Sequence, residues 1–182
     1  MIASAHVAAG AVAGLAAARS TPNRIGRVVT AFALGFLSHI ALDAFQHSDY
    51  GSLTRTATLG VVLVELVVIT AVIGGIVRRR VPRPWPGYML AGVLGAGIAD
   101  AKFIAPMILP PDLAWTVMQA TGSFHRLFHA PAPSIPLLGL GIEILCTLVL
   151  LVTLAAFPRI GPRVVRHPTP AVRPSPPLED VA

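Results

Sequence analysis

Ser38-His39-Ile40-Ala41-Leu42-Asp43-Ala44-Phe45-Gln46-His47 places three metal-ligating side chains at the end of an apolar run. His39, Asp43 and His47 follow one another at intervals of four residues, so on a helix they share one face and rise about 6 Å per step. Polar groups in hydrocarbon are costly unless they pair with one another or hold an ion. Imidazole and carboxylate together suit zinc, manganese or iron. The stretch therefore predicts either a metal site or a polar helix end that only bonds neighbouring helices.

The composition places this stretch in an integral membrane protein. Of the 182 residues, 54% are hydrophobic and 12% are charged, whereas a soluble domain carries about 25% charged residues. The arginines cluster at the ends of apolar runs, as membrane-topology signals do, and this distribution excludes a nucleic-acid-binding surface despite the net charge of +6. We expect the lipid bilayer to be the main partner. The single Cys146 lies inside an apolar run and is interpreted as a packing residue.

The apolar runs predict an all-α bundle of about five transmembrane helices within residues 1–157. The predicted spans cover residues 1–18, 28–46, 57–77, 87–109 and 137–157. Residues 112–130 are too polar to span and predict a short interfacial or re-entrant helix on the outer side. Residues 158–182 form a Pro- and Arg-rich tail that we expect to be disordered. Gly10 and Gly14, four residues apart, allow the first span to approach another helix closely.

The distribution of basic residues predicts the orientation in the membrane. With the N-terminus outside and five spans, the tail is cytoplasmic, and 11 of the 14 Lys and Arg residues lie on the cytoplasmic side. The sequence thus predicts a multi-pass protein of a bacterial-type inner (cytoplasmic) membrane. This topology also puts every ionisable side chain of the spans in one layer, in the outer half of the bilayer. The members of that layer are His6, His39, Asp43, Glu65, Asp100, Lys102 and Glu143, with His125 and His129 in the short outer helix.

A shared depth predicts one site, for which the side chains have different expected roles. The candidate metal ligands are His6, His39, Asp43, His125 and His129. Asp100 is a further ligand or bridging group, and His47 completes the ligand shell or handles protons. A buried glutamate can orient a ligand histidine, act as a general base or simply bond a neighbouring helix, and all three alternatives stay open for Glu65 and Glu143. Lys102 and Arg126 either bind an anionic substrate or extend toward lipid headgroups.

Leu34-Gly35-Phe36-Leu37-Ser38-His39-Ile40-Ala41-Leu42-Asp43 resembles the Ser-His-x-x-x-Asp helix of bacterial inner-membrane metal-dependent hydrolases, the LexA-regulated membrane-bound hydrolase group. The Pro-Asp-x-Asp-His element usual in that group is absent, and the order of the elements differs. The His-x-x-x-Asp spacing is also distantly similar to zinc-dependent phospholipase C. The resemblance implies a metal-dependent hydrolase. The other positions that carry it are His6, Asp100, His125, Arg126 and His129.

Three functions compete at this point. The first is a membrane-embedded hydrolase with an outward-facing site, a divalent metal (zinc, with manganese or iron as alternatives) and a lipid-linked or phosphoester substrate. The second is a non-enzymatic protein that binds or transports metal ions, or that holds haem between His6 and His39. The third is a structural protein whose polar layer only ties helices together. No HExxH, GxSxG or P-loop occurs in the chain, which argues against zincin proteases, serine hydrolases and nucleotide hydrolysis.

Overall fold

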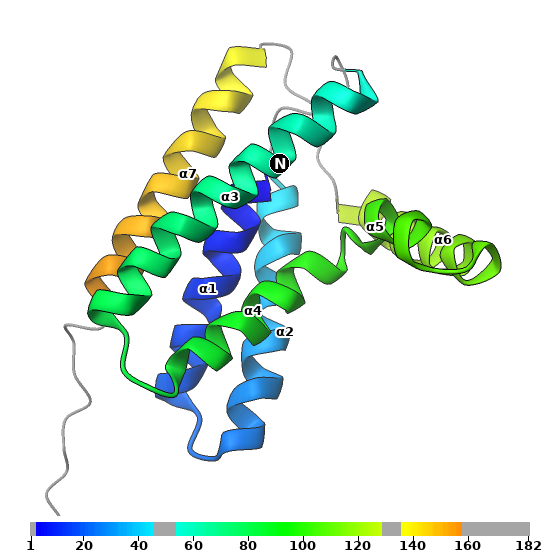
Figure 1. Cartoon of the computed structure of the whole chain (residues 1–182). Helices are drawn as coiled ribbons and strands as arrows, with labels where there is room; N and C mark the ends of the chain where they lie inside the picture. The colour runs from blue at the N-terminus through cyan, green and yellow to red at the C-terminus, as the bar shows by residue number, and fades with distance from the viewer. Residues whose placement is uncertain (1–2, 46–53, 129–135, 158–182) are drawn as a thin grey trace, which may run out of the picture.

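The computed structural model describes residues 3–45, 54–128 and 136–157, and within these ranges the chain is entirely helical, with no strand (Figure 1). The predicted all-α class is therefore confirmed. The predicted tail over 158–182 lies outside the described residues. The helices are α1 (Ala3–Ser20), α2 (Arg24–Asp43), α3 (Arg55–Arg80), α4 (Trp85–Ile98), α5 (Ala101–Ile108), α6 (Pro111–Phe128) and α7 (Pro136–Ala156).

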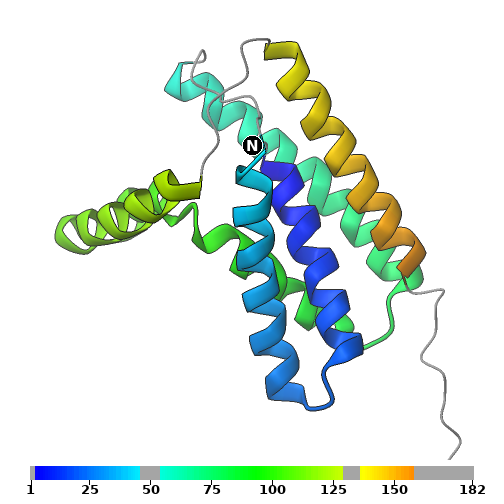
Figure 2. The same cartoon turned by 180° about the vertical axis from the view of Figure 1, so that it is seen from behind.

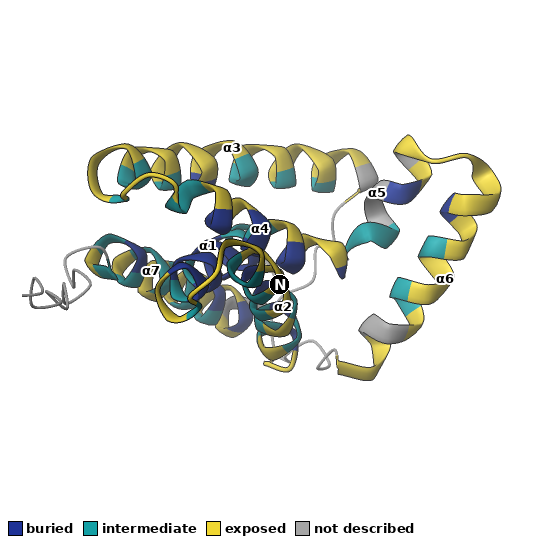
Figure 3. Ribbon diagram, turned by 90° about the horizontal axis from the view of Figure 1, so that it is seen from below, coloured by how far each residue is buried: buried dark blue, intermediate teal, exposed yellow. Residues whose placement is uncertain are grey.

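Helix α1 forms the centre of the bundle. It contacts α2 and α4 extensively and α7 and α3 along its other sides, and in Figure 3 the buried residues concentrate where these helices meet. Most of its side chains are those of alanine and glycine, so its neighbours come close on every side. Leu15 adds the largest apolar side chain of α1 to a core that it shares with Met89 of α4 and Leu154 of α7.

Glycines bring the backbones of α1, α2 and α4 into direct contact. A Cβ atom added at Gly10, Gly35 or Gly92 would lie less than 3.0 Å from backbone atoms of the facing helix. The carbonyl oxygen of Gly92 in α4 is the nearest atom both to a Cβ added at Gly10 and to a Cβ added at Gly35, so this one residue contacts α1 and α2. Gly14 meets the backbone of Tyr88 and Met89 in the same way. The predicted close contact through Gly10 and Gly14 is confirmed.

Among the described residues, three helices are long and apolar enough to cross a membrane by length and composition. They are α2, residues Thr56–Arg80 of α3, and residues Leu138–Ala156 of α7. The five predicted spans are thus confirmed only in part. Helix α4 has 14 residues, which is too few to span. Helix α1 has 18 residues, but its alanines and glycines serve contacts between helices more than contacts with lipid.

The prediction of one continuous helix over residues 87–109 is wrong. Helix α4 ends at Ile98, and Asp100 leaves the helical conformation with φ −90° and ψ 9° before α5 begins. The sequence before the break contains Gly95 and Gly97, which weaken a helix. Beyond it, α5 and α6 pack on each other and project sideways from the bundle (Figures 1 and 2). Helix α6 corresponds to the predicted short outer helix and runs across the long direction of the bundle (Figure 3).

The bundle has two chemically different ends. We call the end where α1, α3 and α7 begin and α2 finishes the histidine end; the opposite end is the basic end (Figure 1). The helix termini at the basic end carry Arg19, Arg24, Arg27 and the run Arg78–Arg80. The helices therefore sort the basic residues to one end as the sequence predicted, and the histidine end carries the candidate site.

Candidate metal centre

Two helices supply the core of the candidate site at the histidine end. His6 lies in the first turns of α1, and His39 and Asp43 lie one turn apart at the end of α2. All three are buried, with exposed fractions of 5%, 2% and 3%. Each offers one ligand atom, and these atoms lie within 4.8 Å of one another. Gly35, one turn before His39, allows the close contact with Gly92 that holds this face of α2 against the bundle.

The carboxylate of Asp43 contacts Nε2 of both imidazole rings. Its Oδ1 is 3.3 Å from Nε2 of His6, and its Oδ2 is 3.0 Å from Nε2 of His39. The two rings stack on each other, with centroids 4.0 Å apart and an interplanar angle of 23°. The cluster therefore joins α1 to α2 through ring stacking and two contacts to one carboxylate.

These distances fit a divalent metal ion. Ligand atoms about 2.0–2.1 Å from a tetrahedral zinc ion lie about 3.3 Å from one another, and the two nitrogen–oxygen separations are 3.0 and 3.3 Å. The buried Nδ1 of His6 has no hydrogen-bond partner in the described part of the chain, so this ring has coordinating capacity to spare. Two histidines and one aspartate also leave a fourth position open, as in catalytic zinc sites. The group can thus hold a metal, and its donor set does not distinguish zinc from manganese or iron.

Asp100 lies at the exposed edge of this group. Its Oδ1 is 3.9 Å from Nε2 of His39, and its side chain is 34% exposed. Asp100 precedes α5, yet its side chain makes no capping hydrogen bond to that helix. The break between α4 and α5 therefore leaves this carboxylate directed at the site rather than at the backbone. Asp100 thus lies near His39, while its predicted role as a further ligand or bridging group stays a prediction.

The stacked rings do not fit haem. A haem iron held by two histidines needs the porphyrin plane between the imidazoles, whereas the centroids of His6 and His39 are only 4.0 Å apart. The space between the rings is closed by their own contact, so this arrangement of the pair does not accommodate a haem.

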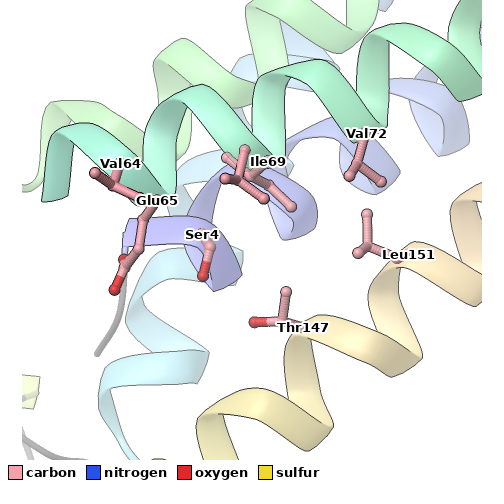
Figure 4. A pocket seen from close by; sticks show the side chains of 8 residues that line it. Ser4, Val64, Glu65, Ile69, Val72, Thr147 and Leu151 are labelled. Atoms are coloured by element: carbon pink, nitrogen blue, oxygen red, sulfur yellow. The ribbon is translucent and has the colours of Figure 1, made fainter. Parts of the chain in front are cut away.

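The structure separates the two glutamates from the histidine cluster. Glu65 of α3 lines a cavity on the other side of α1, together with Ser4 (Figure 4). Glu143 of α7 is fully buried. Among the described residues, the group that could hold a metal comprises His6, His39 and Asp43, without either glutamate. The sequence contained no information on the direction in which each of these side chains faces around its helix.

The remaining candidates lie on or near the projecting helices. Lys102 is half-buried on α5, two residues beyond Asp100. Arg126 is exposed on α6, where its Nη2 donates a hydrogen bond to Oγ of Ser123 at 3.3 Å. His125 belongs to α6, but its side chain is outside the described part of the structure, and His129 lies outside the described residues altogether. Their predicted role as ligands stays a prediction.

The predicted helical face of His39, Asp43 and His47 is described only for its first two members. Helix α2 ends at Asp43, and Ala44 and Phe45 form a turn in which each backbone N–H donates to a carbonyl of the preceding turn. His47 lies outside the described residues, so its predicted role stays a prediction.

Sequence reasoning did not single out Ser4 and Thr147, which line the cavity beside Glu65. Helical spacing contains a signal for Thr147, because it lies four residues after Glu143 on α7. Ser4 and His6 are two residues apart, about 200° around the helix, so they face opposite sides of α1.

Fold and site together define a helical membrane protein with a possible His/His/Asp metal-binding group. No family model, curated protein or solved structure matches this chain.

Proposed function

We propose that this protein is a membrane-embedded, metal-dependent hydrolase that acts on a lipid-linked phosphoester. The observation that supports the proposal best is the combination of a buried His6–His39–Asp43 group with a partly exposed carboxylate, Asp100, at its edge. A purely structural tie between α1 and α2 gives no reason for a second carboxylate that faces solvent. A hydrolytic site can use such a carboxylate as a general base.

The roles follow from burial. His6, His39 and Asp43 would hold the ion, with zinc as the first choice and manganese or iron as alternatives. A divalent ion in such a site supplies Lewis-acid activation of water near neutral pH. Asp100 is the one carboxylate of the group with substantial solvent access, so we assign to it the acceptance of a proton from the attacking water.

The substrate class follows from the position of the site. The basic end of the bundle carries the arginines that mark the cytoplasmic side of membrane proteins, so the histidine end would face outward from a bacterial-type cytoplasmic membrane. Each of the candidate spans α2, α3 and α7 has one terminus at the histidine end, where we expect the lipid headgroups to lie. Arg126 is exposed and could neutralise a phosphate there. The resemblance to inner-membrane hydrolases supports the same reaction class.

The decisive experiment measures metal and turnover in the same samples. Detergent-purified wild type, Asp43→Ala and a control, His167→Ala, are compared by elemental analysis and by headgroup or phosphate release from mixed lipid micelles. We expect wild type and the control to hold about one metal ion and to lose activity with a chelator. Asp43→Ala should lose both metal and activity. Release that is equal in all three and insensitive to chelator would contradict the proposal.

Deep burial of the cluster favours a second candidate, a protein that binds metal without turnover. The three side chains are no more than 5% exposed, and such enclosure slows exchange with solvent. Under this alternative the metal content follows the same pattern across the variants, while a broad panel of lipids yields no hydrolysis. The same samples therefore separate the two functions.

A further inference from the structure

Seven arginines gather at the basic end of the bundle, at helix ends and in the connections from α1 to α2 and from α3 to α4 (Figure 1). Within the described part of the chain none of them forms an ion pair, and the ion pairs that occur there join histidine to aspartate. The positive charge of this end is therefore not neutralised by neighbouring side chains. We call this group the arginine rim, and its members are Arg19, Arg24, Arg27, Arg78, Arg79, Arg80 and Arg83.

The beginning of α4 connects the two halves of the rim. Trp85 packs against one apolar cluster that contains Ala18 and against a second one that Val81 borders. Ala18 directly precedes Arg19, and Val81 directly follows Arg80. The arginines of the α1–α2 connection and those of the α3–α4 connection therefore flank the same tryptophan.

Two arginines of the rim have neutral partners. Arg27 donates a hydrogen bond from Nε to the carbonyl of Thr21 at 2.7 Å, and its guanidinium carbon lies 5.8 Å from the ring centroid of Tyr88. The guanidinium carbon of Arg19 lies 5.7 Å from the ring centroid of Phe157. Such contacts orient a guanidinium group and leave its full charge in place. The rim is thus held in position for an anion.

The chain has little negative charge to offer the rim. Asp43 and Asp100 belong to the metal centre, at the other end of the bundle. Residues 158–182 carry four arginines against Glu179 and Asp180, so that segment is itself basic. The compensating charge therefore has to come from a partner.

Exposed apolar side chains next to the rim indicate the kind of partner. Ile25, Val28 and Val29 follow Arg24 on α2 and are 78%, 45% and 61% exposed. The candidate span Thr56–Arg80 of α3 likewise ends within the rim. A lipid covers such side chains with its acyl chains while its phosphate lies at the level of the arginines, whereas an acidic protein or a nucleic acid leaves them in water.

The charge of the headgroup distinguishes between the lipids that could lie there. Phosphatidylcholine and phosphatidylethanolamine carry a cation beside the phosphate, so they leave the charge of the rim uncompensated. Phosphatidylglycerol carries the phosphate charge alone. Guanidinium groups bind phosphate oxygens through charge-assisted hydrogen bonds, and basic groups at the ends of transmembrane helices attract anionic lipids.

We propose that the arginine rim is a binding surface for anionic phospholipid, whose phosphate contacts arginines from both halves of the rim around Trp85 and whose acyl chains cover Ile25 and Val29. The proposal does not rest on the proposed function, because the metal centre lies at the opposite end of the bundle.

Quenching of tryptophan fluorescence by brominated lipid measures this preference at one position. The chain contains two tryptophans, Trp85 at the rim and Trp115 on α6. Trp115→Phe therefore reports on the rim, and Trp85→Phe is the matched control. Each protein is reconstituted into bilayers of phosphatidylcholine and phosphatidylglycerol in which one lipid or the other carries bromine near the glycerol end of its acyl chains. The ratio of the two quenching values gives the relative affinity for phosphatidylglycerol.

In Trp115→Phe we expect phosphatidylglycerol to quench Trp85 more strongly than phosphatidylcholine does at low salt. Sodium chloride at about 1 M should remove the difference, because the Debye length is then about 3 Å. Arg24→Gln and Arg79→Gln, added singly, should each lower the relative affinity about fivefold, which corresponds to about 1 kcal/mol per arginine. Arg126→Gln removes an exposed arginine outside the rim and should leave the preference unchanged.

Equal quenching by the two lipids in Trp115→Phe at low salt would overturn the proposal, as would a preference that survives both arginine substitutions. An equal preference at Trp115 in the control protein would overturn the assignment to the rim. Inorganic phosphate should displace no more phosphatidylglycerol than sodium chloride of the same ionic strength does, and complete displacement would assign the rim to free phosphate instead. Asp43→Ala should lose metal and keep the lipid preference, so the failure of the proposed function and the failure of this inference are distinguishable.

Discussion

Gly35→Ala tests whether backbone contact between α2 and α4 holds the metal centre in place. Gly35 lies one turn before His39, and a Cβ atom at this position would approach the carbonyl group and Cα of Gly92. The carbonyl carbon, 2.8 Å away, would have to recede to 3.4 Å for ordinary contact, and the carbonyl oxygen would have to move further. These are backbone atoms, so no side-chain rotation relieves the overlap, and the helices must separate.

The magnitude follows from two opposing effects. Overpacking a tight contact costs about 1–3 kcal/mol, and the clash with backbone places this case in the upper part of that range. Replacing a helical glycine by alanine contributes about 1 kcal/mol in the other direction. We expect a net loss of about 2 kcal/mol, which corresponds to a drop of about 4–8 °C in the unfolding midpoint by the scaling of domains of this size.

The assay is thermal unfolding in mild detergent, followed by circular dichroism. Gly75→Ala on α3 is the matched control, because a Cβ there meets nothing within 4 Å; it should leave the midpoint unchanged or raise it slightly. Because Gly35→Ala forces α2 away from α4, it should also move His39 away from Asp100. A Gly35→Ala protein as stable as Gly75→Ala would refute close backbone packing at this site.

Three further predictions concern the site and the topology. His6→Ala and His39→Ala should each lower bound metal to a minor fraction of the wild-type content, as elemental analysis would detect, and normal content in both would mean that the ligands are wrong. Asp100→Asn should weaken metal affinity by no more than about 10–100-fold and should abolish turnover at saturating metal, whereas full activity would remove Asp100 from the reaction. In a Cys146→Ala background, Ser123→Cys should react with a membrane-impermeant thiol reagent in intact cells and Ser20→Cys should not; the opposite pattern would invert the proposed orientation.

Hydropathy and charge predicted most of the helices because these signals are local. The runs that became α3 and α7 were placed to within about three residues at each end, since arginines and prolines bound them in the sequence. The break at Asp100 was not predicted, because the apolar run continues on both sides of it. The break places the carboxylate of Asp100 3.9 Å from His39, and this contact depends on the packing of another helix, α2.

The candidate site was predictable where it lies on one helix. His39 and Asp43 are four residues apart, and helical periodicity places them together. The partnership of His39 with His6 involves residues that are far apart in sequence, and it depends on how closely α1, α2 and α4 pack. The glycines that permit this packing were visible, but the sequence alone did not identify Gly92 as the common partner of Gly10 and Gly35.

Helix α1 explains why the side chains of a single predicted layer face different neighbours. Depth in a membrane follows from position along a helix, so His6, Asp43 and Glu65 could all be assigned to one level from the sequence. The direction in which a side chain points around its helix axis identifies its partners only when the neighbouring helices are known. Because α1 is central, His6 faces α2 on one side while Ser4 faces α3 and α7 on the other. A thin, alanine-rich helix thus separates the buried His/Asp group from Ser4 and Glu65 by about one helix width.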